Sequence, residues 1–181
     1  METADEAMVL ARVRAGETAA YAELVTRHAP MARRLAVLSG AGADADDVVQ
    51  EAFVKAYRSL SSFRDGAEFR PWLLRIVVNE SRNLHRGRSR RSDRELRVVR
   101  EDARLVTGSD PAEAAVGGER REALLAAVRS LPEDLREVVT CRYLLELSEA
   151  ESAASLGIPP GTVKSRLHRG LARLREELPD V

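Results

Sequence analysis

The chain has 181 residues, with 29 basic and 29 acidic side chains and a formal net charge of zero. Apolar residues make up 44% of it, aromatic residues only 4%, and there is one cysteine. This composition favours helices packed through Leu, Val and Ala over a β-sandwich, and it excludes a disulfide framework or a multi-cysteine zinc site. The acidic start of the chain and the lack of a long apolar run predict neither a signal peptide nor membrane insertion, so we expect a cytoplasmic protein.

The first half of the chain shows the apolar spacing of helices. The expected helices cover 5–15, 17–38, 44–60 and 68–86. Gly16 separates the first two, and the glycine-rich turn at 39–42 ends the second. Asp44, Asp46 and Asp47 begin the third helix, where acidic side chains interact favourably with the helix dipole. These helices predict a small four-helix domain over 1–88.

The third predicted helix carries a polar surface opposite its apolar stripe. Asp47, Gln50 and Glu51 lie there beside Val54. Such a patch is suited to a basic helical partner, although a solvated face is the more common explanation of this pattern alone.

The fourth predicted helix has one apolar side and one basic side. Four residues recur at spacings of four, three and four, which places them on one face. They are Arg75, Asn79, Arg82 and Arg86. Guanidinium groups suit phosphates, and the amide of Asn79 suits a base edge. We expect the preceding loop to present Phe63 and Arg64 beside them, while a merely solvated basic face explains this helix equally well.

Regular apolar spacing disappears between 89 and 118, where charged residues crowd together and Gly108 and Pro111 interrupt the chain. We therefore predict a flexible linker over this range. A second helical domain follows over 119–181. Its expected helices cover 119–130, 132–145, 148–156 and 160–178.

Residues 148–175 have the pattern of a helix-turn-helix. A short helix ends at Gly157, a turn follows, and Pro160 begins a second helix that would lie in the major groove. Opposite an apolar stripe, this helix carries Lys164, Ser165, Arg166, His168, Arg169 and Arg173. An amphipathic helix with a solvated face is the alternative, but the turn and the lack of acids over 164–175 favour binding to DNA.

Four stretches together resemble the extracytoplasmic-function (ECF, group 4) sigma factors of the sigma-70 family. They are DDVVQEAFVKAYRSLSSFR, FRPWLLRIVVNESRN, SLPEDLREVV and LGIPPGTVKSRLHRGLARLR. These bacterial proteins join core RNA polymerase and direct it to promoters. The resemblance implies an all-α protein with sigma region 2 over 1–88, a flexible linker over 89–118 and sigma region 4 over 119–181.

The resemblance also implies roles for the residues described above. Asp47, Gln50 and Glu51 match the segment that binds the β′ clamp helices of the polymerase. An aromatic contact and amide hydrogen bonds would offset the few kcal/mol needed to flip a base of the −10 element. The implied −10 residues are Phe63, Arg64, Arg75, Asn79, Arg82 and Arg86. The implied −35 residues are Lys164, Ser165, Arg166, His168, Arg169 and Arg173.

The implied partners are core RNA polymerase through its β′ clamp helices and β flap, promoter DNA, and an anti-sigma factor. No cofactor, metal or catalytic activity is implied, and His28, His85 and His168 are too dispersed to suggest an enzyme. A free-standing, dimeric helix-turn-helix regulator is the alternative, although no segment looks like a dimerisation helix.

One departure from the family pattern lies in the first helix of the helix-turn-helix. Ser152 and Ser155 stand where the family usually has large aliphatic residues. Losing two buried aliphatic side chains would cost several kcal/mol, so we expect a second domain that is marginally stable when free.

Overall fold

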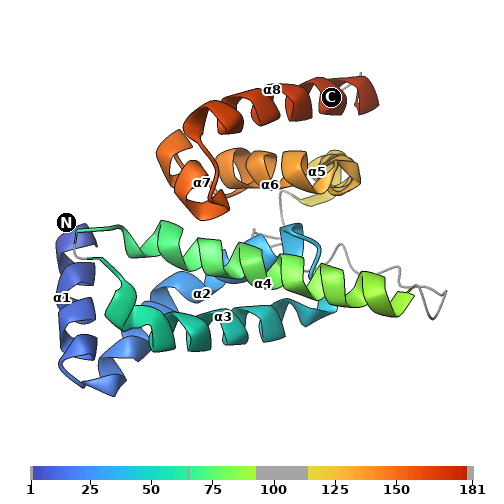
Figure 1. Ribbon diagram of the computed structural model, residues 1–181. Helices are drawn as coiled ribbons and strands as arrows, with labels where there is room; N and C mark the ends of the chain where they lie inside the picture. The colour runs from blue at the N-terminus through green and yellow to red at the C-terminus, as the bar shows by residue number, and fades with distance from the viewer. Residues whose placement is uncertain (1, 65, 93–113, 179–181) are drawn as a thin grey trace.

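The computed structural model describes residues 2–64, 66–92 and 114–178, with side chains described over 5–64, 66–87 and 121–178. Every regular element in these ranges is helical, which confirms the all-α class (Figure 1). The first unit contains α1 (Glu2–Arg14), α2 (Tyr21–Leu38), α3 (Ala45–Ser59) and α4 (Phe69–Ser92). The second unit contains α5 (Ala114–Ser130), α6 (Glu133–Val139), α7 (Glu149–Leu156) and α8 (Pro160–Glu177).

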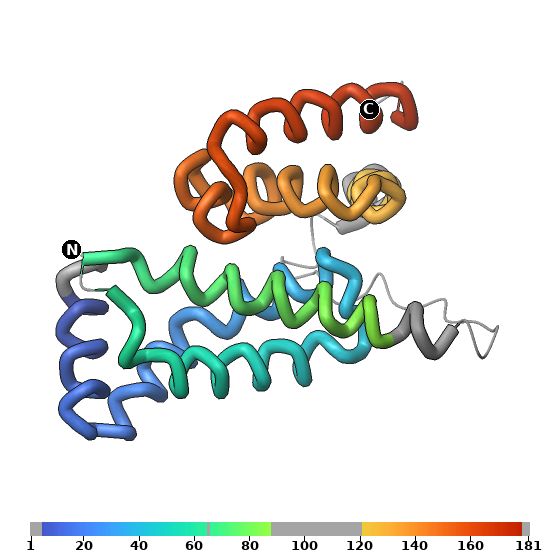
Figure 2. The backbone as a smooth tube through the Cα atoms, viewed as in Figure 1, coloured from blue at the N-terminus to red at the C-terminus, as the bar shows by residue number. Residues whose placement is uncertain are grey.

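The first unit is built around α2, α3 and α4, which run lengthwise, while α1 stands across one end of them (Figure 2). Its core consists of the apolar stripes that the residue spacing predicted. Leu24 of α2, Ala52 of α3, and Phe69 and Leu73 of α4 are fully buried. The polar faces of α3 and α4 are thereby turned away from this core.

The turn between α7 and α8 follows from local sequence. The Ser148 hydroxyl accepts a hydrogen bond from the Glu151 backbone N–H, and the Glu151 carboxylate accepts one from the Ser148 backbone N–H. The helix ends at Gly157, whose φ of 67° is left-handed and favours glycine. Pro160 is the first residue of α8, where its missing N–H costs nothing. These devices produce the helix-turn-helix that the sequence predicted.

The helices extend into the predicted linker at both ends. α4 continues to Ser92, because residues 88–92 contain no glycine or proline, and α5 begins at Ala114. The predicted linker over 89–118 therefore contains helical residues at both of its ends. Its remaining part, residues 93–113, lies outside the described residues.

The two units pack directly on each other, which the sequence did not predict. α7 lies against α4, and α6 lies between α4 and α8 (Figure 1). One continuous cluster of buried side chains contains Leu73 and Val77 of α4 together with Val138, Leu147 and Leu156 of the second unit. The sequence predicted two domains joined only by a flexible linker. In this structure the two units also pack together in a closed arrangement.

Ser152 and Ser155 of α7 are both fully buried. Neither hydroxyl has a hydrogen-bond partner within the described part of the chain. A buried hydroxyl without a partner costs about 1 to 3 kcal/mol. The two serines therefore weaken α7 where larger apolar side chains would stabilise it.

Candidate nucleic-acid interface

The predicted basic face of α4 exists, but part of it is covered by the second unit. Asn79 is exposed, whereas Arg82 is half-buried. The Arg82 Nε and Nη2 donate hydrogen bonds to Glu137 Oε1 at 2.8 Å and Oε2 at 2.5 Å. Glu137 belongs to α6 and is 2% exposed. Hydrogen bonding to this carboxylate raises the pKa of Arg82 above its ordinary value.

The two other arginines of this face differ in their surroundings. The guanidinium carbon of Arg75 would lie 3.2 Å from a Cβ placed on Gly157, so Arg75 reaches the end of α7. Arg86 is exposed and its Nη2 donates to Asn83 Oδ1 at 2.7 Å. Arg75, Asn79 and Arg86 are thus exposed, with Arg75 next to the second unit, whereas Arg82 is half-buried against it.

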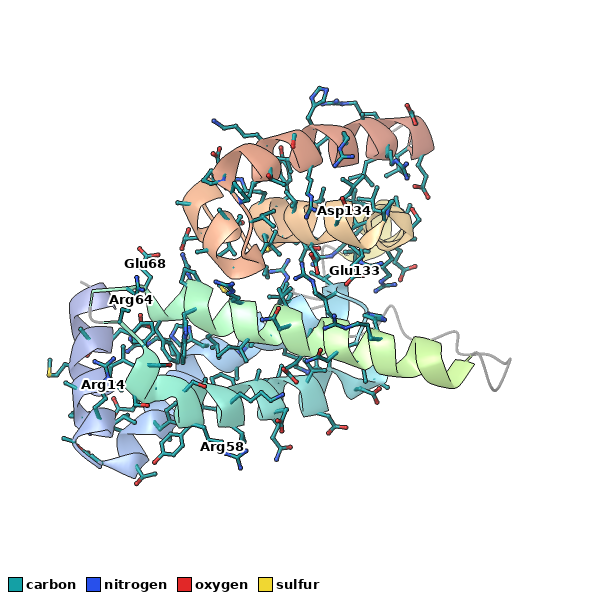
Figure 3. All side chains as sticks on the ribbon, viewed as in Figure 1. Arg14, Arg58, Arg64, Glu68, Glu133 and Asp134 are labelled. Carbon is teal, nitrogen blue, oxygen red and sulfur yellow. The ribbon has the colours of Figure 1, made fainter. Side chains whose placement is uncertain are left out.

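The loop before α4 differs from the expectation at Phe63. We expected the loop to present this ring, but Phe63 is only 6% exposed. It packs against Phe69 and Trp72, with ring centroids 5.9 and 4.9 Å away. The apolar ring fills a pocket beside α4, and its backbone carbonyl accepts a hydrogen bond from Arg14. Arg64, the other predicted loop residue, is exposed (Figure 3).

The predicted face of α8 is largely open. Lys164, Ser165, His168, Arg169 and Arg173 are exposed, and Arg166 is half-buried. The opposite side is held by Val163 and Leu174, which are buried. The sequence pattern therefore placed both sides of this helix correctly.

Carboxylates of neighbouring helices flank the basic face of α8. Asp134 Oδ2 of α6 lies 3.5 Å from Arg166 Nε and 3.7 Å from Arg169 Nη2. Glu149 Oε2 lies 3.6 Å from Lys164 Nζ. These pairs are long and partly exposed, so their contribution to stability is small.

Gly170 is a structural residue that the sequence reasoning missed. It is buried in α8, and a Cβ at this position would lie 2.9 Å from Val139 Cγ2. The missing side chain lets α8 approach α6 closely. A glycine inside a long helix, where it costs about 1 kcal/mol, was the available signal.

The third predicted surface lies on α3, where Asp47, Gln50 and Glu51 are all exposed. A groove of about 630 Å³ adjoins Gln50, between α2 and α3. Its apolar lining comes from Tyr21, Val25, Ala29, Val49, Phe53, Val54 and Tyr57. Tyr57 has the helical spacing of the apolar stripe of α3, but it is 41% exposed at this rim. The sequence predicted the polar edge of the groove but not its apolar floor.

Comparison with known proteins identifies the family to which this chain belongs. The family model "Sigma-70 region 2" matches residues 24–91, and the model "Sigma-70, region 4" matches residues 121–174. The "ECF RNA polymerase sigma-E factor" of Escherichia coli (strain K12) is 36% identical over 174 residues, covering 93% of this chain and 91% of the relative. The chain belongs to the ECF sigma factors. The Haemophilus influenzae sigma-E factor is 34% identical over 181 residues, covering 96% of this chain and 95% of its own.

Solved structures show the same relationship for this sigma factor. CnrH in complex with the cytosolic domain of CnrY is similar with a TM-score of 0.69 and 28% identity, covering 97% of this chain and 98% of that one. The sigma factor RpoE of Bartonella quintana, in complex with the anti-sigma factor NepR, also has a TM-score of 0.69, at 26% identity, covering 88% of this chain and 97% of its own. The sigma-factor prediction is confirmed, and the alternative of a free-standing dimeric regulator is not favoured.

Two further observations on the described part of this sigma factor concern metal binding and membrane insertion. None of its groups of His, Cys, Asp and Glu side chains is arranged to hold a metal ion. Among the described helices, none is long and apolar enough to cross a bilayer.

Proposed function

We propose that this sigma factor binds core RNA polymerase, directs it to promoters by recognising −10 and −35 elements, stabilises strand opening, and performs no catalysis itself. The observation that supports this most strongly is the pair of basic helices α4 and α8, one in each family-matched unit. Both carry arginines on a face turned away from their own unit's core. The site of action would be the cytoplasm, where the polymerase works.

For α8 we propose recognition of the −35 element as duplex DNA. Arg169 and His168 are exposed near the middle of the helix, and Lys164 and Ser165 are exposed near its start. Residues in the first half of a recognition helix reach base edges in the major groove. Arg173, further along, would hold a phosphate, as would Arg166 once it separates from Asp134.

For α4 we propose recognition of the −10 element as an unstacked strand. Asn79 is exposed and supplies both amide donors and an acceptor for a base edge. Arg64, Arg75, Arg82 and Arg86 would hold the strand backbone. A stacking role for Phe63 requires its loop to open, because the ring is buried in this conformation.

For α3 we propose binding to the β′ clamp helices of the polymerase. Asp47, Gln50 and Glu51 supply acceptors for basic side chains, and the adjoining groove supplies apolar area. We propose the second unit as the contact for the β flap. One of the two similar structures is a sigma factor in complex with an anti-sigma factor, so we also propose an anti-sigma partner here.

Run-off transcription tests the proposal. Purified core RNA polymerase is mixed with a library of genomic fragments, with and without this protein. We expect discrete transcripts only when the protein is present, and their start sites will define the two promoter elements. Equal transcription in both samples, with no association between protein and polymerase at modest ionic strength, would contradict the proposal.

A further inference from the structure

The acidic start of α6 lies between the two basic helices. Glu133 and Glu137 face α4, where Glu133 Oε1 is 3.9 Å from Arg82 Nε, and Asp134 faces α8 (Figure 3). A cavity of about 410 Å³ opens between the units at this point. Its lining includes Arg82, Arg86, Glu133, Asp134, Glu137 and Arg166. One short helix therefore supplies acids to both surfaces that we assign to DNA.

The contact between Arg82 and Glu137 has the geometry of a phosphate contact. Two guanidinium nitrogens of Arg82 donate to the two oxygens of one carboxylate, at 2.8 and 2.5 Å. A guanidinium binds a phosphate through the same parallel pair of hydrogen bonds. While Glu137 holds Arg82, no DNA phosphate can take that position.

Burial distinguishes this contact from an ordinary surface ion pair. Glu137 is 2% exposed, and burying a carboxylate is costly unless it is paired and hydrogen-bonded. By contrast, Asp134 and Arg169 are 42% and 61% exposed in their own pair. The ion pair that α6 makes with α4 is therefore much more buried than the ion pairs it makes with α8.

Other contacts close the same interface. Arg70 of α4 bonds to Glu151 of α7, and Arg75 packs against the turn at Gly157. Cys141 is fully buried in the cluster shared by both units, and desolvation raises the pKa of its thiol to about 12. The only cysteine of the chain is thus an unreactive thiol next to Arg82 and Glu137.

We propose that α6 is an autoinhibitory element, in which Glu137 occupies the place of a DNA phosphate on Arg82 and holds the second unit against the middle of the strand-binding face of α4. In the closed form Arg75, Asn79 and Arg86 of α4 stay exposed, but Glu137 already occupies the guanidinium of Arg82. Release requires the second unit to move away, which separates Glu137 from Arg82 and exposes both. This inference rests on the proposed role of α4 in binding a DNA strand.

The test compares Glu137→Gln with Glu80→Gln in the full chain. Both substitutions remove one negative charge from a buried or nearly buried carboxylate that pairs with a base. Glu80 is 13% exposed and pairs with Lys55 at 2.6 Å within the first unit. The probe is a fluorescent single-stranded DNA of 20 nucleotides, titrated at several salt concentrations without polymerase.

We expect Glu137→Gln to bind this DNA about tenfold more tightly than the unchanged protein. The slope of log affinity against log salt should steepen by about 0.7 for each phosphate gained. Glu80→Gln should change affinity less than twofold. Equal affinities for the two variants would overturn the inference, because net charge alone would then explain any gain. Glu137→Met, which has similar volume and no acceptor, serves as the second variant.

Alkylation of Cys141 separates the two ways in which the inference can fail. We expect Glu137→Gln to raise the alkylation rate about tenfold under native conditions, and Glu80→Gln to leave it unchanged. If neither alkylation nor DNA binding changes, Glu137 does not hold the units closed, and the proposed function stands untouched. If alkylation accelerates while DNA binding does not, α4 is not a DNA surface, and both the autoinhibition and the proposed role of α4 are overturned.

Discussion

The two basic helices look alike in sequence and differ in their surroundings. α8 presents its cations to solvent beside partly exposed carboxylates, while α4 has its central arginine held by a carboxylate from the other unit that is 2% exposed. A pattern of bases along a helix therefore shows which face is basic, but not whether that face is available. The packing of the two units against each other determines whether a basic side chain on such a face is free to bind DNA.

The largest expected difference between the two helices is in stability. Arg82→Ala leaves Glu137 buried without a partner, so we expect the free energy of unfolding to fall by about 3 kcal/mol. Arg169→Ala removes an exposed, long ion pair and should change it by less than about 0.5 kcal/mol. Chemical denaturation of both variants measures the difference. Similar losses in the two would show that the Arg82 contact is no firmer than a surface pair.

Arg169→Ala should instead affect binding to DNA. Loss of a bidentate contact to a base edge should weaken binding of the polymerase complex to a −35 duplex by about 1 to 3 kcal/mol and relax selectivity at one position. Fluorescence anisotropy with a series of single base-pair changes measures this. Unchanged binding at every salt concentration would remove Arg169 from the −35 surface.

Gly170 tests whether α8 is held by packing on α6. Gly170→Ala would place a Cβ 2.9 Å from Val139 Cγ2 within a well-packed contact, so we expect a loss of about 1 to 3 kcal/mol in stability. Gly161→Ala is the matched control on the same helix, because a Cβ there meets no atom of the described residues within 4 Å. It should be neutral or stabilise by up to about 1 kcal/mol. Two equal effects would argue against the close packing.

Asn79→Ala should separate strand binding from duplex binding. Asn79 is exposed on the side of α4 assigned to the unstacked strand. Losing its hydrogen bonds should disfavour the open complex by about 1 kcal/mol. Permanganate reactivity of the promoter reports the opening, and binding to unmelted duplex should stay unchanged. An equal loss in both measurements would contradict the proposed role.

Ser152→Ala and Ser155→Ala should have the smallest effects, and in the opposite direction. Each removes from α7 a buried hydroxyl that has no hydrogen-bond partner among the described residues, so each should stabilise the free protein by about 1 kcal/mol. Ser148→Ala, which removes the cap of the same helix, should destabilise it by about 1 kcal/mol. Thermal unfolding shows whether each substitution raises or lowers the stability of the free protein.

Much of the fold was readable from residue spacing and turn chemistry. The stripes of α2, α3 and α4, the turn at Gly157 and Pro160, and the polar face of α8 all agree with the sequence pattern. These features depend on residues close together in the chain. The assignment to ECF sigma factors likewise depended on four contiguous stretches.

The features that the sequence did not predict depend on contacts between residues that are far apart in the chain. Glu137 sits in a short amphipathic helix, and nothing in its neighbours indicates that Arg82, 55 residues away, would bury it. Phe63 follows two serines in a loop, a context typical of exposure, yet the space beside Phe69 and Trp72 accepts its ring. Tyr57 has helical spacing for the core but lies at the rim of the groove instead.

The distance between the two units, measured with and without core RNA polymerase, tests the closed form most directly. Spin labels on Ala22→Cys of α2 and Glu176→Cys of α8, both exposed sites, report it by pulsed electron resonance, since the buried Cys141 stays unlabelled. We predict one narrow distance distribution for the free protein and a shift to longer distances in a polymerase complex that starts transcripts. An unchanged distribution in that active complex would contradict the account.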